Sequence, residues 1–180
     1  MPSYVAFLRG MNLGGRRIKN EEFRAEFEAL GFDAVATFRA SGNVIFASDK
    51  GAEARLTKTI ESGLGDALGY EVPVFLRSCA EVEEIAAHEP FPAKQVVASK
   101  GKLQVLFLAK APSARDRKAA LAEATDEDRL AVEGRELYWL PSGGISESEL
   151  DLKAIGKALG AGTMRTMGTV EQIAAKHCRA

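Results

Sequence analysis

The stretch "SYVAFLRGMNLGGRRIKNEEFRAEFEALG", residues 3–31, decides how the chain begins to fold. Residues 4–9 combine β-branched and aromatic side chains and stop at a glycine, which is typical of a strand. From Asn20, a residue type favoured as an N-cap, three apolar side chains recur at helical spacing until Gly31 closes the pattern. The sequence therefore predicts a strand and a helix joined by a polar loop.

The residues that follow extend this start to six elements. The segments "AVATFRA" (34–40) and "NVIFAS" (43–48) are typical of two short strands. A helix is predicted over residues 52–69, where leucine and isoleucine recur four residues apart, and a strand over residues 71–77. Strand, helix, strand, strand, helix, strand is the ferredoxin-like order, so we assign residues 1–78 to a ferredoxin-like N-terminal lobe.

The rest of the chain, residues 79–180, predicts a second, smaller α+β lobe, and the two lobes together are expected to form one compact domain. A short helix comes first, and the prolines of "EPFPAK" (89–94) interrupt regular structure after it. There follow a strand over 102–109, a helix over 113–125, a hairpin turning at Glu133 and Gly134, and a helix over 148–159. The predicted fold class is therefore α+β, with a second lobe that lacks the last strand of the first.

The C-terminal residues predict one more helix. Thr169 and Gln172 have the spacing of a capping box at its start. The pattern analysis indicates no internal repeat.

Composition limits the class of protein. Of the 180 residues, 46% are hydrophobic and 27% are charged, which is typical of a folded domain, and the net charge of -1 argues against a general nucleic-acid binder. The N-terminus has neither the basic region nor the apolar core of a signal peptide, so we expect a cytoplasmic location and no membrane segment. Because only two cysteines and two histidines occur, we expect reduced thiols and no metal.

The polar loop after the first strand is the segment most suggestive of a binding site. Residues 8–19 contain three glycines and four cations and no acid. In a sheet of ferredoxin-like order the end of the first strand meets the start of the third, so this loop should lie beside the turn Ser41–Asn43. Glycine N–H groups, cations and short polar side chains together suit a phosphate or a carboxylate. The alternative, ordinary turn residues and solvated cations, stays open, and neither GxGxxG nor GxxxxGK[ST] is present.

Four motifs resemble those of a known family. They are "YVAFLRGMNLGG" (4–15), "SGNVIF" (41–46), "PFP" (90–92) and "TMRTMGTVEQIA" (163–174). In this order, and over nearly the whole chain, they resemble the uncharacterised bacterial family called domain of unknown function 1697. The resemblance implies a ferredoxin-like lobe followed by a second α+β lobe, and it implies no particular reaction. The family pattern near the C-terminus looks like Thr-x-Arg-Asn-Trp-Asn-Thr-Val, whose centre is replaced here by the Thr-Met-Gly of residues 166–168.

We expect the loop, the Ser41–Asn43 turn and the "TMRT" segment (163–166) to form a cleft that binds a small anionic ligand bearing a phosphate or a carboxylate. The candidate ligand-binding residues are Arg9, Asn12, Gly14, Gly15, Ser41, Asn43, Arg165, Thr166 and Thr169. Catalytic residues and any cofactor are unknown, and the oligomeric state is open. Replacing Arg9 or Asn43 by alanine should weaken ligand binding and leave stability nearly unchanged.

Other functions remain open. An RNA-recognition motif has the same strand order, but the third strand here keeps only a glycine and one phenylalanine of its signature. Strands that are apolar at successive positions also predict a sheet covered on both faces, which disfavours nucleic acid as a partner. The remaining alternatives are a protein-interaction module without catalysis and an enzyme of unknown reaction, although neither His88 nor His177 stands in a Ser-His-Asp or Cys-His setting.

Overall fold

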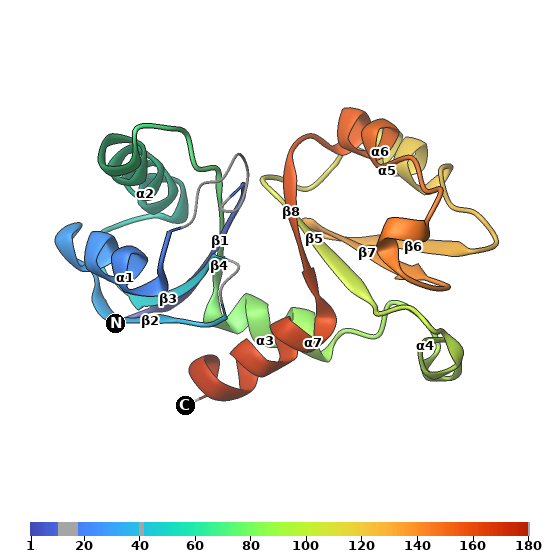
Figure 1. Ribbon diagram of the computed structural model, residues 1–180, viewed down its shortest axis with the longest axis horizontal. Coiled ribbons are helices and arrows are strands. Elements are labelled where there is room, and N and C mark those ends of the chain that lie inside the picture. Colours follow the sequence, from blue (N-terminus) through green and yellow to red (C-terminus); the bar gives the residue numbers. More distant parts are fainter. Residues whose placement is uncertain (11–17, 40–41, 180) are drawn as a thin grey trace. The chain divides into compact units, whose positions relative to one another are not determined.

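A computed structural model describes residues 1–10, 18–39 and 42–179 of the chain. The chain divides into two units, one made of Met1–Ile85 with Ile173–Ala180 and the other of Ala86–Gln172. Each unit contains a four-stranded antiparallel sheet with helices, as Figure 1 shows. The fold class is therefore α+β in both halves of the chain.

The first unit follows the element order predicted for it. Its sheet has the order β2-β3-β1-β4. The elements are β1 (Ser3–Leu8), α1 (Asn20–Ala29), β2 (Asp33–Thr37), β3 (Asn43–Ala47), α2 (Glu53–Leu68) and β4 (Val74–Ser78). The first helix begins one residue earlier than predicted, because Lys19 and not Asn20 takes the N-cap position, and the backbone N–H of Lys19 bonds Glu22 Oε2 at 2.8 Å.

The central strand β1 is buried on both faces. Ala6 and Leu8 belong to the apolar cluster that includes Phe27 of α1 and Ile60 of α2. On the opposite face, Val5 and Phe7 are also fully buried at 0% exposure. The sheet therefore presents no open aromatic platform along β1, in agreement with the apolar pattern of the sequence.

The second unit repeats this arrangement. Its sheet has the order β6-β7-β5-β8. The elements are β5 (Gln104–Leu108), α5 (Ala114–Leu121), β6 (Asp128–Glu133), β7 (Glu136–Pro141), α6 (Leu152–Leu159) and β8 (Gly162–Thr166). Its apolar cluster joins one face of the sheet, including Leu137 and Trp139, to Ile155 of α6.

Strand β8 corrects the prediction that this unit lacks a last strand. The strand is only five residues long and follows α6 after two residues. The sequence pattern therefore does not separate it clearly from the helix. Gly160, at φ 83, ends the helix and allows the chain to reverse. Residues 162–166, to which the sequence analysis assigned no helix or strand of their own, form the strand that pairs with β5.

The remaining helices follow β4 and β8. They are α3 (Cys79–Ala87), α4 (Ala93–Ala98), α7 (Met167–Ile173), a short 3-10 helix η1 (Ile145–Glu147) and a π-helix η2 (Ala174–Cys178). The predicted capping role of Thr169 is wrong: α7 begins at Met167, and Thr166 Oγ1 accepts the backbone N–H of Thr169 at 3.2 Å. Among the described residues, no helix combines the length and apolar character that crossing a membrane requires.

The structure reveals an internal repeat that pattern analysis missed. The segments "RSCAEVEEIAA" (77–87) and "RTMGTVEQIAA" (165–175) both run from the end of a fourth strand into a helix, and they are identical at six of eleven positions. Arg77 lies opposite Val5 of β1, and Arg165 lies opposite Val105 of β5. The two units therefore share one plan down to the position of an arginine on the fourth strand.

The two cysteines correct another expectation. Cys79, the first residue of α3, and Cys178, the last of η2, form a disulfide with their Cα atoms 5.0 Å apart. This separation lies within the range that a disulfide requires. The prediction of reduced thiols rested on the small number of cysteines, and a pair 99 residues apart in sequence gives no local signal of its pairing.

Replacing Cys178 by serine should lower the free energy of unfolding by roughly 2–4 kcal/mol, because the crosslink restricts a long loop of the unfolded chain. Urea denaturation without reductant measures this difference. Reductant should destabilise the wild-type protein by the same amount and should leave Cys178→Ser unchanged. Equal stability of the wild-type protein with and without reductant would contradict the crosslink.

Candidate functional site

The turn between β2 and β3 is held closed by a buried asparagine. Asn43 is 1% exposed, and its Nδ2 donates to the carbonyl of Phe38 at 2.9 Å. The backbone N–H of Phe38 donates in return to the carbonyl of Asn43 at 3.0 Å. Between them, Arg39 has a φ of 58, a left-handed conformation that is strained for a residue with a side chain. Strain of this kind is concentrated at functional sites, so the turn is a candidate.

Both ends of the polar loop meet this turn. The backbone N–H of Leu8 donates to the carbonyl of Gly42 at 2.9 Å, and Asn20 Nδ2 donates to the carbonyl of Arg39 at 3.1 Å. The expectation that the loop leaves the sheet beside the start of β3 is confirmed for these described residues. Four predicted ligand-binding residues, Asn12, Gly14, Gly15 and Ser41, lie outside the described part of the chain.

Four cations lie in the turn or next to residues that contact it. Arg9 and Lys19 are exposed at the two described ends of the loop, and Arg39 lies in the turn itself. Lys176, from η2, places its Nζ 5.2 Å from the centre of the Phe38 ring, and Arg39 places its Cζ 5.5 Å from the same ring. We call this group the basic turn, defined by Phe38, Arg39, Gly42 and Asn43 with Arg9, Lys19 and Lys176.

Sequence reasoning missed two cations of the basic turn, as well as the ring of Phe38. Arg39 was assigned to the predicted strand 34–40, and its positive φ is visible only in the structure. Lys176 is 137 residues further along the chain, in a helix for which the sequence predicts no contact with the turn. The only signal for Lys176 was its place two residues before Cys178, whose partner was unknown.

Arg165, predicted as a ligand-binding residue, is a buried cation of the second unit. Its side chain is 8% exposed, and Nη1 donates to Thr163 Oγ1 and to the carbonyl of Met164, both at 2.9 Å. Burial lowers the pKa of Arg165 from its ordinary value to about 10, because removal from water disfavours the charged guanidinium. A pKa of about 10 still leaves the side chain positively charged at neutral pH.

Thr166 and Thr169, the other predicted ligand-binding residues near Arg165, form a separate hydrogen-bonded pair. Thr166 Oγ1 caps α7 by accepting the backbone N–H of Thr169, and it lies 3.0 Å from Thr169 Oγ1. Adjacent residues of a strand point to opposite faces of a sheet, so Thr166 lies on the face of β8 opposite to Arg165. The structure therefore joins Arg165 to Thr163 and joins Thr166 to Thr169, as two separate pairs.

Arg77 is the counterpart of Arg165 in the first unit, and sequence reasoning missed it. It is 1% exposed, and its Nη1 donates to the carbonyl of the preceding residue, Leu76, at 2.8 Å. Arg165 donates to Met164 in the same way. The signal in the sequence was the repeated Arg-Ser and Arg-Thr before the two similar helices.

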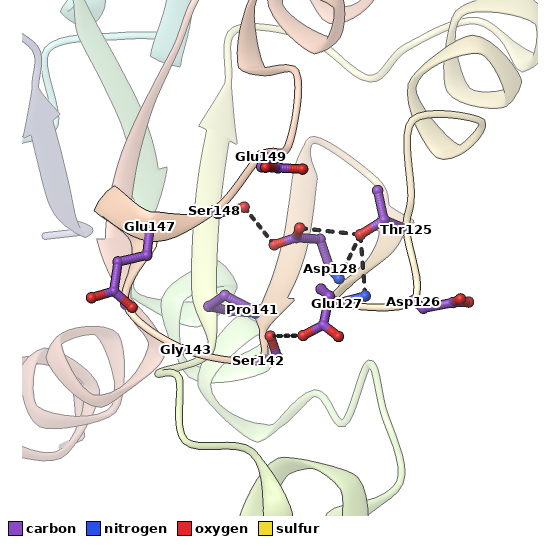
Figure 2. Close-up of a pocket in the computed structure, with 11 residues that line it drawn as sticks. Thr125, Asp126, Glu127, Asp128, Pro141, Ser142, Gly143, Glu147, Ser148 and Glu149 are labelled. Carbon is purple, nitrogen blue, oxygen red and sulfur yellow. Dashed lines mark hydrogen bonds between the residues drawn. The ribbon is translucent and has the colours of Figure 1, made fainter.

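The second unit also has a pocket of about 510 Å³ that is lined by acidic residues, shown in Figure 2. Its walls come from residues 125–128, 141–144 and 147–149. At one wall, Asp128 accepts hydrogen bonds from Trp139 Nε1 at 2.8 Å, Ser148 Oγ at 2.7 Å and Thr125 Oγ1 at 3.1 Å. This carboxylate holds the wall together, and the described residues contain no group of three or more acidic, histidine or cysteine side chains placed to hold a metal.

The fold and the site define this protein as a pair of α+β units with cations gathered at one turn, rather than as a member of a class with known chemistry. The chain belongs to the family "Protein of unknown function (DUF1697)", whose model matches residues 1–138. Among solved structures, the conserved bacterial protein SP0830 from Streptococcus pneumoniae is similar, with a TM-score of 0.70 and 20% identity over 97% of each chain. That likeness shows the fold. No curated protein matches the sequence.

Asn43→Ala should lower the free energy of unfolding by about 1–3 kcal/mol, because it removes a buried hydrogen bond and leaves the carbonyl of Phe38 without that donor. This replaces the expectation that Asn43 can be changed without loss of stability. Asn20→Ala is the matched control, since its bond to Arg39 is exposed to water and should contribute less than about 1 kcal/mol. Urea denaturation of both variants measures the difference, and equal effects would contradict a structural role for Asn43.

The stability of the wild-type protein relative to Arg165→Met should rise with pH above about 10. A basic group whose pKa is lowered on folding binds its proton less tightly in the native state, so the cost of burying the charge is fully present below the folded pKa and disappears as pH rises through it. One pH unit above that pKa, the relative gain should be about 1 kcal/mol. Urea denaturation of both proteins between pH 8 and 11 tests this, and a constant difference would show that burial does not perturb Arg165.

Proposed function

We propose that this protein binds a small anionic ligand, bearing a phosphate or a carboxylate, at the basic turn. The observation that carries the proposal is that one strained turn holds Arg39 and packs against Lys176 through the ring of Phe38. The turn also bonds Leu8 and Asn20, the residues next to Arg9 and Lys19. Like charges repel, and a cluster of one sign raises the local concentration of oppositely charged ligands. The net charge of the whole chain is only -1, so this concentration of cations is a local feature.

The polar loop supplies the second element of the proposal. Gly10, the first glycine of the loop, has a φ of 76, and Gly42 in the facing turn has a φ of 75. Successive backbone N–H groups in such conformations form concave anion-binding nests. We include Asn12, Gly14, Gly15 and Ser41 as ligand-binding residues on this ground and from the composition of the loop.

Arg165 is proposed as a further anion-binding group. An anion beside a buried guanidinium restores the stabilisation of charge that burial removes. The assignment of Arg165, Thr166 and Thr169 to the same ligand as Arg9 and Asn43 is a proposal from the sequence motifs. Since the hydroxyl of Thr166 caps α7 and the hydroxyl of Thr169 is hydrogen-bonded to it, their contribution to binding should be smaller than that of Arg165.

We infer that each unit is a ferredoxin-like fold. Both units follow the order strand, helix, strand, strand, helix, strand, and each sheet has its first strand between its third and its fourth. In this order the ends of the first and third strands meet at one edge, which is where the basic turn lies. A cytoplasmic location is also part of the proposal.

A single-stranded nucleic acid is the alternative ligand. Phe38 with two cations beside its ring resembles the stacking and charged contacts that such ligands use. Binding through the sheet surface in the manner of an RNA-recognition motif is disfavoured, because both faces of β1 are buried. Salt separates the two ligands, since a chain of phosphates releases many counterions on binding and a small anion does not.

A thermal-shift screen of the purified protein tests the proposal, with inorganic phosphate, pyrophosphate, nucleotides, sugar phosphates, small carboxylates and short RNAs as ligands. A ligand present at about 100 times its dissociation constant should add about 2.7 kcal/mol of stability. Arg39→Ala and Lys176→Ala should each weaken the response about ten-fold, because each removes a charged partner of the anion.

The matched control is Lys58→Ala, which removes an exposed cation from α2. It should leave affinity within about two-fold of wild type, since a distant exposed charge is screened by salt. A ligand whose affinity falls equally in all three variants would contradict the site, and a response to RNA alone with a steep salt dependence would support the nucleic-acid alternative.

A further inference from the structure

We propose that the Cys79–Cys178 disulfide is a reversible redox site that latches the C-terminal π-helix η2 onto the basic turn. The disulfide joins the start of α3 to the end of η2, and all of these residues lie in the first unit. The proposal concerns the state of the turn and does not depend on which ligand the turn binds.

The thiolate of Cys79 is a favourable leaving group in thiol–disulfide exchange. Cys79 is the first residue of α3, a nine-residue helix, and it is buried. The start of this helix is fixed by a reciprocal cap, in which Ser78 N–H bonds Glu81 Oε2 at 2.8 Å and Glu81 N–H bonds Ser78 Oγ at 3.2 Å. Backbone N–H groups at a helix N-terminus favour a thiolate, so the departing sulfur of Cys79 is stabilised where it forms.

Cys178 is the sulfur that an incoming thiol reaches. Its side chain is half-buried, and its neighbours in sequence are Lys176, His177 and Arg179. Partly exposed cysteines among basic residues are the ones that exchange readily, because the positive charge attracts the attacking thiolate. The two cysteines therefore have unequal roles, with Cys178 attacked first and Cys79 released.

The reaction is thiol–disulfide exchange with a dithiol reductant. The reductant's thiolate bonds to Cys178 Sγ, the Cys79–Cys178 bond breaks, and its electron pair leaves on Cys79. The second thiol of the reductant then attacks its own mixed-disulfide sulfur and releases Cys178 as the other thiol. Two electrons and two protons pass from the dithiol, which becomes a disulfide, to the two cysteines. In a reducing compartment such a disulfide is transient rather than permanent.

A chain of contacts joins this disulfide to the basic turn. Next to Cys178, the ring of His177 lies edge-on to the ring of Phe38, with centroids 6.0 Å apart, and Lys176 lies over the same ring. Phe38 is in turn bonded to Asn43 through both its carbonyl and its N–H. The π-helix η2 continues directly from α7, and the last turn of a helix frays unless it is tied down, so loss of the crosslink should release Lys176 and His177 from the ring.

Hydrogen exchange on the full-length protein in its oxidised and reduced forms tests the latch. Reduction by a dithiol should speed amide exchange about ten-fold or more in residues 174–178, with a smaller increase in the described residues of the turn and no change in β5. Alkylation followed by mass spectrometry counts no free thiols before reduction and two after it, and oxidised glutathione should restore the protected form. Unchanged protection of residues 174–178 in the reduced protein would overturn the latch.

Two variants test the order of attack. Incubated with oxidised glutathione, Cys79→Ser should form a mixed disulfide at Cys178 about ten times faster than Cys178→Ser forms one at Cys79, since only Cys178 is half-exposed. Equal rates, a faster reaction at Cys79, or a native disulfide that a dithiol cannot reduce until the protein unfolds would each overturn a redox site. Cys178→Ser should also show the fast exchange of the reduced form without any reductant.

Discussion

Burial of both faces of the central strands is the constraint on which the rest of the structure depends. Val5 and Phe7 of β1, and Val105 and Phe107 of β5, lie on the sheet face opposite to the helices. They are as buried as the residues that face the helices. A sheet covered in this way has no free surface for a ligand, so polar chemistry is confined to strand ends and turns. The same burial encloses the guanidinium of Arg165 beside Val105, which is why its pKa falls.

Much of the first unit could be predicted from the sequence because local patterns and tertiary packing agree there. The phenylalanines of α1 and the four-residue spacing in α2 mark faces that are in fact buried. Strand β8 could not be predicted in this way, because its five residues alternate between half-buried and buried and carry threonines that equally suit a helix cap. The internal repeat could not be detected as a fixed period in the sequence, because the separation between equivalent residues changes. It is 88 positions between Arg77 and Arg165 but 100 positions between Val5 and Val105.

The candidate site likewise has one part that the sequence predicts and one part that it does not. The glycines and cations of residues 8–19 form a local signal, and the meeting of the first and third strand ends follows from topology alone. Arg39 and Lys176 depend on features with no local signature, a positive φ in one case and a disulfide between distant cysteines in the other. Composition predicted reduced thiols because it reports the number of cysteines, whereas pairing depends on the distance that the fold sets between them.

The basic turn is a local concentration of positive charge, which favours oppositely charged ligands. The basic turn is maintained by strong local constraints: a buried asparagine closes it, a hydrogen bond from Asn20 holds the strained Arg39, and a disulfide two residues from Lys176 ties down η2. None of these constraints is needed to fill the apolar cluster, which packs on the helix-covered face of the sheet. A site that is organised before its ligand arrives loses less entropy on binding. Under the proposal of an anionic ligand, these constraints preorganise the basic turn, and the disulfide controls the position of Lys176.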